Sequence, residues 1–217
     1  MTISDRTLAI VGTGNIGGTL AADFAAGGQD FLLAGRNADA ARKIAADLGG
    51  HAEAVSVDEG IQRADVLVLA VWFDVFQQLI AQYGAQLAGQ VIVDPTNAVG
   101  PDGAGGYRKV IGEQESSGQI LAGLLPTGTR LVKAFGSLSA PTLATVARRE
   151  PERAVLFYAA DDLAAGDLVA ELIRTAGYEP VRVGGLDQSI RIEMFGDLHE
   201  YGALGRVVTK TEALEAI

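Results

Sequence analysis

The most constraining feature of the sequence is the stretch VGTGNIGG, in which Gly12, Gly14 and Gly17 follow the spacing G-x-G-x-x-G. Residues 7–11 form a short apolar run that predicts a buried strand. Ile16 opens a stripe of apolar side chains every fourth position, which predicts a helix packed on that strand. With 28 glycines in the chain, a tight turn alone would explain the spacing. A strand, glycine turn and helix in this order nevertheless favour a dinucleotide-binding unit.

Strands and helices alternate along the rest of the chain. Apolar runs predict further strands at residues 31–34, 65–71, 91–94, 130–135, 155–158 and 180–183. Helical patterns lie between them, after Asn37, over 75–87 and 119–125, and after Asp161. This alternation predicts an α/β fold of the Rossmann type, with a doubly wound, mostly parallel sheet.

No repeat or linker marks a clear domain boundary. We expect a nucleotide-binding domain over residues 1–185 and a small helical C-terminal cap over residues 186–217, with breaks at Gly196, Gly202 and Gly205. Residues 98–118, rich in glycine and polar side chains, form a long loop. Because that loop follows the carboxyl end of a strand, where open α/β sheets bind ligands, we interpret it as a candidate lid.

Composition excludes several classes of function. Seventeen basic and 27 acidic residues give a net charge of -10, which disfavours nucleic acid and anionic membranes as partners. The chain has no cysteine, so thiol chemistry and disulfides are excluded. His51 and His199 lie in no pattern typical of a metal site or a catalytic triad. The N-terminus lacks the features of a signal peptide and no apolar run reaches membrane-spanning length, so we expect a cytoplasmic protein.

The glycine loop predicts specific contacts with a cofactor. Gly12 permits the tight turn, Gly14 lets the backbone approach a pyrophosphate, and Gly17 allows close packing of helix and strand. The backbone N–H groups at the start of the helix, from Thr13, Asn15 and Ile16, are the expected phosphate donors.

The end of the second predicted strand indicates which dinucleotide binds. NAD enzymes usually carry a carboxylate there, whereas this chain reads LLAGRN. Gly35 precedes Arg36, whose planar guanidinium suits a 2′-phosphate, and Asn37 can donate another hydrogen bond. We therefore predict NADP as cofactor, with a solvated surface arginine as the alternative interpretation of Arg36.

The nicotinamide side of the crevice should lie at the ends of the next strands. Val71, Trp72 and Phe73 are expected to line it, together with Asn97 in the sequence DPTN. Trp72 would alternatively pack beneath the loop, and Asn97 would alternatively serve turn formation. Lys133 is the one nearby candidate for a proton donor, either facing the site or pairing structurally.

Several stretches together resemble one family. These are VGTGNIGG, AGRN, VDPTNAVG, LVKAFGSLSAPTLA and the segment from YEPVRVGGLDQSIRIEM onward. In this order they resemble the coenzyme F420-dependent NADP oxidoreductases, whose NADP-binding domain also occurs in six-transmembrane metalloreductases. The resemblance implies hydride transfer between NADPH and a deazaflavin or flavin-like acceptor without a catalytic side chain. It further implies that Ala134 lies near the nicotinamide, and that Met194 and Phe195, in the cap, lie near the second ring.

One position departs from the family. Where members commonly carry Asn or His after the K-A-F segment, this chain has Gly136. The acceptor therefore stays open between a deazaflavin, a flavin, a quinone or another small carbonyl or imine. A non-catalytic NADP-binding redox sensor and a dehydrogenase that uses Lys133 as acid are the alternative functions. By analogy, a homodimer is expected.

Overall fold

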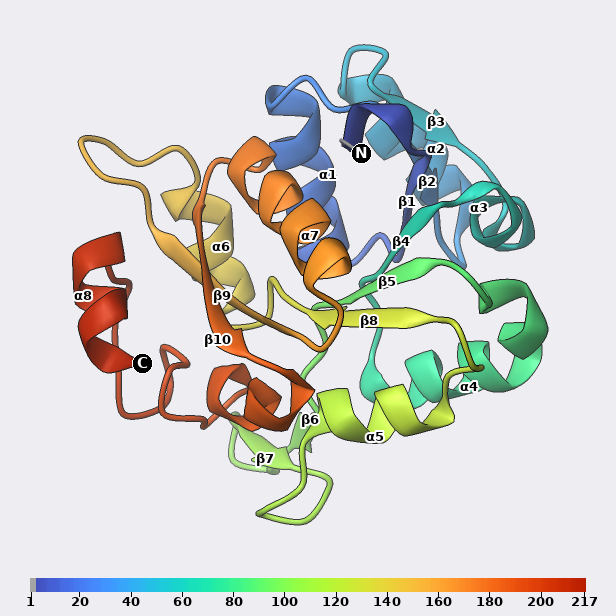
Figure 1. Cartoon of the computed structure of the whole chain (residues 1–217). Helices are drawn as coiled ribbons and strands as arrows, with labels where there is room; N and C mark the ends of the chain where they lie inside the picture. Colours follow the sequence, from blue (N-terminus) through green and yellow to red (C-terminus); the bar gives the residue numbers. More distant parts are fainter. Residues whose placement is uncertain (1–2) are drawn as a thin grey trace.

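The computed structural model describes residues 3–217 and is built around an eight-stranded sheet (Figure 1). Its strands are β1 (Leu8–Val11), β2 (Phe31–Ala34), β3 (Ala52–Ala54), β4 (Val66–Leu69), β5 (Val91–Asp94), β8 (Arg130–Lys133), β9 (Val155–Ala160) and β10 (Glu179–Gly184). They lie in the order β10-β9-β8-β5-β4-β1-β2-β3. Neighbouring strands are parallel except β8 and β9. The predicted fold class is therefore confirmed.

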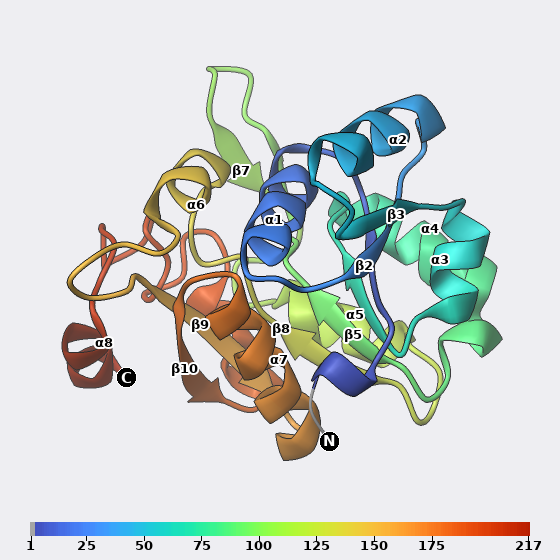
Figure 2. The same ribbon diagram turned by 90° about the horizontal axis from the view of Figure 1, so that it is seen from above.

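Helices cover both faces of the sheet. One face packs against α1 (Asn15–Ala26), α2 (Ala38–Asp47), α6 (Ala140–Val146) and α7 (Leu163–Thr175), and the other against α3 (Val57–Arg63), α4 (Phe73–Tyr83) and α5 (Ser117–Leu124). Short 3-10 helices occur at η1 (Ile3–Asp5) and η2 (Gly84–Leu87). Figure 2, seen from above, shows α1, α6 and α7 together on one side of the sheet.

Burial on both faces explains the strand sequences. Every residue of β1, β2, β4 and β5 is buried, so these strands read as apolar runs rather than alternating patterns, apart from Asp94 at the end of β5. Several helices start at a polar side chain that accepts a hydrogen bond from the backbone N–H three residues on. Ser56, Ser116, Ser139 and Asp162 do so for α3, α5, α6 and α7.

Some boundaries differ from the sequence-based expectation. The strands predicted over 65–71 and 130–135 end at Leu69 and Lys133, and the short β3, α3 and α6 were not predicted. Beyond β8, Phe135 has a φ of 64°, a left-handed conformation outside the β region, so the strand ends before it. The apolar run continues past the strand because the turn that follows it is also buried.

The segment predicted as a long loop contains ordered structure. An antiparallel hairpin forms between β6 (Val99–Pro101) and β7 (Tyr107–Lys109). At its tip the Asp102 carboxylate accepts hydrogen bonds from the backbone N–H groups of Ala104 and Gly106, at 2.7 and 2.9 Å. The hairpin thus stabilises its own turn, and its role as a lid stays a prediction.

The C-terminal segment is helical only at its two ends. It forms η3 (Leu186–Ile192) and α8 (Lys210–Ala216), and residues 193–209 form neither helix nor strand, so the helical prediction is wrong there. A Cβ built on Gly202 would lie 1.7 Å from the carbonyl oxygen of Gly196, so the backbone folds back on itself at these glycines. The segment packs on β9 and β10 through Ile192, Leu198 and Val208.

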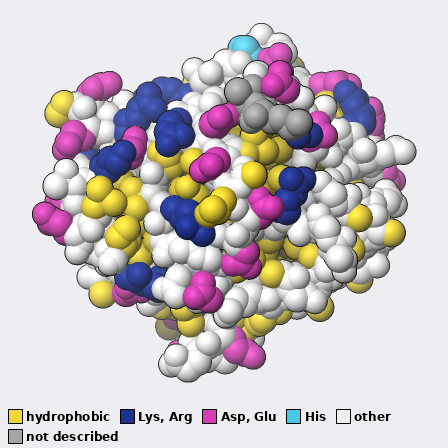
Figure 3. Space-filling model, in the orientation of Figure 1, with side chains coloured by type: hydrophobic (Ala, Val, Ile, Leu, Met, Phe, Trp, Pro, Cys, Tyr) yellow, Lys and Arg dark blue, Asp and Glu magenta, His cyan; other side chains and the backbone are white. Residues whose placement is uncertain are grey.

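The surface carries charges of both signs. Figure 3 shows Lys and Arg side chains interspersed with Asp and Glu on the face seen in Figure 1. Among residues 3–217, no helix is long and apolar enough to cross a membrane.

Candidate nucleotide and acceptor site

The glycine loop lies where the chain changes direction within the sheet. Strand β1 is flanked by β2 on one side and β4 on the other, so the crevice at their carboxyl ends is the topological switch point. Gly12 has a φ of 120°, and a Cβ there would lie 2.1 Å from the carbonyl oxygen of Ala70. A Cβ on Gly17 would lie 1.9 Å from the carbonyl oxygen of Gly12. Both positions therefore require glycine for the fold itself.

Gly14 is different because a Cβ built on it would meet no protein atom within 4 Å. It is the N-cap of α1, and no side chain caps this helix. Asn15 is exposed, and it begins the helix together with Ile16, after Thr13 in the loop. An uncapped helix start that is open to solvent fits a pyrophosphate, which the free N–H groups and the helix dipole would stabilise.

The loop also contacts the end of β2. The Gly12 backbone N–H donates to the carbonyl oxygen of Ala34 at 2.8 Å, and a Cβ on Gly35 would lie 2.9 Å from the Thr13 side chain. Arg36 follows, is exposed and forms no ion pair with any residue in the described range 3–217. Its guanidinium is therefore available to an anion at this edge.

Asn37 acts as the predicted N-cap of α2. Its side-chain oxygen accepts a hydrogen bond from the backbone N–H of Ala40 at 3.1 Å. The side-chain NH₂ group is left to face solvent or a ligand, so the cap and the predicted cofactor contact are compatible.

On the other side of the switch point, Val71 and Trp72 follow β4, and Phe73 starts α4. The Trp72 side chain is 57% exposed, so the alternative that it packs beneath the loop is wrong. The Phe73 side chain, at the start of α4, is buried in the core, and Val71 is partly buried beside Gly12. Trp72 is therefore the residue of this trio with the largest exposed aromatic surface.

Asn97 joins three segments of the chain. Its Nδ2 donates to the carbonyl oxygen of Gly136 at 3.0 Å, and its Oδ1 accepts from the Met194 backbone N–H at 2.6 Å. Both ends of the amide are thus used within the protein. The predicted contact of Asn97 with the cofactor stays a prediction, but its structural role reaches further than a local turn.

Ala134 and Gly136 lie in a tightly packed turn after β8. The Ala134 N–H donates to the carbonyl oxygen of Asp94 at 3.1 Å, and its side chain is buried. A Cβ on Gly136 would lie 2.9 Å from the carbonyl oxygen of Pro95. A side chain at position 136 would therefore require the turn that contains Pro95 to move.

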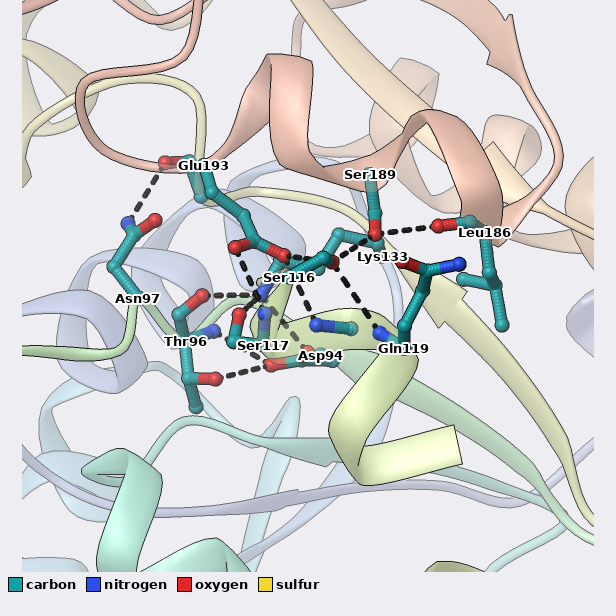
Figure 4. A network of polar contacts seen from close by, with 12 residues as sticks. Asp94, Thr96, Asn97, Ser116, Ser117, Gln119, Lys133, Leu186, Ser189 and Glu193 are labelled. Atoms are coloured by element: carbon teal, nitrogen blue, oxygen red, sulfur yellow. Dashed lines mark hydrogen bonds and ion pairs between the residues drawn. The ribbon is translucent and has the colours of Figure 1, made fainter. Parts of the chain in front are cut away.

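Lys133 is paired structurally (Figure 4). It is 1% exposed, and its Nζ donates to Asp94 Oδ2 at 2.9 Å, to Ser117 Oγ at 3.0 Å and to the carbonyl oxygen of Thr96. Three acceptors account for the three protons of an ammonium group. The arrangement holds the ends of β5 and β8 to the start of α5.

Glu193 belongs to the same buried network and was missed by sequence reasoning. Its carboxylate accepts hydrogen bonds from Ser116 Oγ, Ser117 N and Gly118 N at 2.7, 2.9 and 2.9 Å (Figure 4). The available signal was a single acidic residue between apolar neighbours in IRIEMF. A carboxylate in such a context is either exposed on a loop or buried with partners.

Both histidines have partners in the structure. His51 forms a surface pair with Asp30, whose carboxylate lies 2.7 Å from its Nδ1. His199 is fully buried, and its Nδ1 accepts from the Tyr201 N–H at 2.9 Å. Burial lowers the pKa of His199 to about 4, so the ring is neutral at pH 7. Since Nδ1 accepts a hydrogen bond, the neutral ring carries its proton on Nε2.

The fold and the glycine loop define a Rossmann-type nucleotide-binding protein. Residues 7–98 match the family described as NADP oxidoreductase, coenzyme F420-dependent. This part of the chain is similar to that family of NADP-dependent oxidoreductases, so the resemblance predicted from the motifs is confirmed.

Relatives extend the similarity beyond residues 7–98. The chain is 29% identical over 194 residues to the F420-dependent NADP reductase of Methanothermobacter thermautotrophicus, covering 85% of this chain and 83% of the relative. It is 27% identical over 184 residues to the rat metalloreductase STEAP3, again covering 85% of this chain but only 35% of the relative. This chain thus spans about a third of the length of that metalloreductase.

A solved structure is similar over nearly the whole chain. A hypothetical protein of Sinorhizobium meliloti is 31% identical and superposes with a TM-score of 0.81, covering 97% of this chain and 96% of the other. The similarity therefore includes the C-terminal segment that packs on β9 and β10.

Proposed function

We propose that this protein binds NADPH at the glycine loop and transfers hydride to a deazaflavin or flavin-like acceptor. Gly14 is the observation that carries the proposal: the backbone there is open, at the start of a helix without a side-chain cap. When bound, NADPH would supply the hydride. The chain's own residues would hold the two rings in contact and keep water away, so that alignment provides the catalysis.

Specificity for NADP over NAD is supported by the end of β2. Arg36 is exposed and lacks an ion-pair partner within the described range, and no carboxylate stands there to bind a 2′-hydroxyl. We assign Arg36 to the 2′-phosphate. Gly35 and Asn37 flank it, and Val71, Trp72, Phe73, Asn97 and Ala134 would border the nicotinamide half.

The test of cofactor binding uses the single tryptophan of the chain. Trp72 emission should decrease as NADPH binds and accepts excitation energy. We expect NADPH to bind more tightly than NADH, and Arg36→Ala to weaken NADPH binding by about tenfold while leaving NADH unchanged. Arg153→Ala is the control, because Arg153 is an exposed arginine just before β9, near the other edge of the sheet from β2. Equal affinities for the two cofactors would overturn the role of Arg36.

The test of catalysis is anaerobic NADPH oxidation with oxidised F420, and with FMN, FAD and a quinone in parallel. Saturable reduction of F420 or of a flavin is the expected result. Tight NADPH binding without turnover on any acceptor would contradict the proposal and favour a non-catalytic redox sensor.

A further inference from the structure

Two consecutive residues, Glu193 and Met194, are fastened to the two ends of the segment that carries the β6–β7 hairpin. Asn97 directly precedes that segment, and its Oδ1 accepts a hydrogen bond from the Met194 N–H at 2.6 Å. Ser116 and Ser117 directly follow it and donate to the Glu193 carboxylate at 2.7 and 2.9 Å. The hairpin and the C-terminal segment therefore share one junction.

The Glu193 anchor is strong because its charge is buried. The side chain is 3% exposed, and its two oxygens accept from one hydroxyl and two backbone N–H groups. Those N–H groups open α5, so the helix dipole also favours a carboxylate at this point. The nearby cation, Lys133, gives its three protons to other acceptors. Glu193 thus depends on the start of α5 for its stabilisation.

The residues held by this anchor face the reactive end of the proposed cofactor site. Asn97 also binds the Gly136 carbonyl, which places Met194 beside the turn that follows β8. Next to it, Phe195 has a φ of 74° and a side chain that is 48% exposed. A bulky residue keeps a left-handed conformation only where its surroundings impose it.

The turn that follows β8 lies beyond β4 and β5 in the sheet, on the opposite side of the switch point from Arg36. A dinucleotide bound across the switch point extends from one side to the other. Its reacting ring would then meet an incoming acceptor against Met194 and Phe195.

We infer that Glu193 is a positioning residue for the hydride acceptor: its carboxylate, locked on the start of α5, holds Met194 and Phe195 as the acceptor-side wall. The inference rests on the proposed function. It assigns Glu193 no contact with cofactor or acceptor, so NADPH affinity should not depend on it.

The test compares Glu193→Gln with Glu200→Gln. A glutamine at position 193 would direct an NH₂ group at one of three donors, which breaks the anchor. Glu200 lies in the same segment. Within residues 3–217 its Oε1 accepts one hydrogen bond, from the Ser139 N–H at 2.8 Å, and a glutamine oxygen can keep that bond. We would measure hydrogen exchange of the Met194 amide, the acceptor KM and the Kd for NADPH.

In Glu193→Gln we expect faster exchange at Met194 and an acceptor KM raised by about tenfold, with the Kd for NADPH changed by less than about twofold. Glu200→Gln should match the unmodified protein in all three. Faster exchange with an unchanged acceptor KM would overturn the inference, because the anchor would then be structural only. An unchanged exchange rate of the Met194 amide in Glu193→Gln would overturn it as well.

A second variant covers the case in which Glu193→Gln does not fold. Phe195→Ala removes an exposed side chain and should raise the acceptor KM without changing the Kd for NADPH; an unchanged KM would contradict the inference. If the unmodified protein reduces no acceptor, the proposed function itself fails. If the unmodified protein turns over normally but neither variant changes the acceptor KM, only the inference about Glu193 is overturned.

Discussion

At the residue scale, the glycines of the loop differ in what surrounds them. A Cβ added to Gly12 or Gly17 would overlap backbone atoms, whereas a Cβ added to Gly14 or Gly18 would meet no atom within 4 Å. A side chain at Gly14 would project where the backbone approaches the pyrophosphate. One at Gly18, a turn further along α1, would not.

We therefore predict that Gly14→Ala weakens NADPH binding by about tenfold or more, which is about 1.4 kcal/mol, without lowering the thermal stability of the protein. Gly18→Ala is the control and should leave the Kd unchanged. Titration of Trp72 emission measures both. Equal Kd values for the two variants would show that the cofactor does not lie over Gly14.

A second prediction concerns Gly136. The asparagine that the resemblance leads one to expect here, introduced as Gly136→Asn, should not create deazaflavin activity, because its Cβ would lie 2.9 Å from the Pro95 carbonyl oxygen. Backbone must move to admit it, and we expect a loss of about 1–3 kcal/mol in the free energy of unfolding. Urea denaturation measures the loss. A stable variant with increased F420 reduction would contradict the steric explanation.

At the element scale, the Lys133–Asp94 pair fastens β8 to β5 and, through Ser117, to α5. Lys133→Met leaves the Asp94 carboxylate buried without its cation. We expect this to cost about 3–5 kcal/mol in unfolding free energy. Adding Asp94→Asn removes that charge, keeps an oxygen for the Thr96 N–H, and should recover part of the stability.

The same pair of variants tests Lys133 as a proton donor. If the double variant folds and still transfers hydride, Lys133 is structural, as its three hydrogen bonds indicate. Equal destabilisation in the single and double variants would refute the charge argument. Loss of turnover with stability and NADPH binding retained would support a dehydrogenase that uses Lys133 as its acid.

At the scale of the whole molecule, a partly buried carboxyl group and a fully buried histidine give stability opposite dependences on pH. Burial raises the pKa of Asp23 from an ordinary 3.8 to about 6, against the opposing effects of Tyr178 and Arg148. The stability from Asp23 is therefore present below pH 3.8 and is lost as pH rises through 6. Burial lowers the pKa of His199 from 6.5 to about 4, with Glu200 opposing the shift. The stability from His199 is present above pH 6.5 and is lost as pH falls through 4.

We predict that the two contributions offset each other between pH 4 and 6, where both groups change protonation. Asp23→Asn should make the free energy of unfolding fall more steeply on acidification than in the unmodified protein, and His199→Gln should do the reverse. Urea denaturation at several pH values across this window measures the slopes. Parallel slopes in all three proteins would contradict the assigned pKa directions.

Local patterns determined much of this protein. The spacing of Gly12, Gly14 and Gly17, the apolar runs of the central strands and the missing carboxylate before Arg36 predicted the Rossmann-type sheet, the loop and the family. These signals are readable because a buried parallel strand and a glycine turn each impose constraints on neighbouring residues.

Only the tertiary structure decided how the acceptor side is built. Glu193 bonds to Ser116, 77 positions earlier, and Asn97 bonds to Met194, 97 positions later. The lack of room at Gly136 likewise arises from Pro95, on another turn. Such contacts leave no periodic trace in the sequence, because hydrogen bonding and close packing between distant residues depend on where the whole fold brings their backbones together.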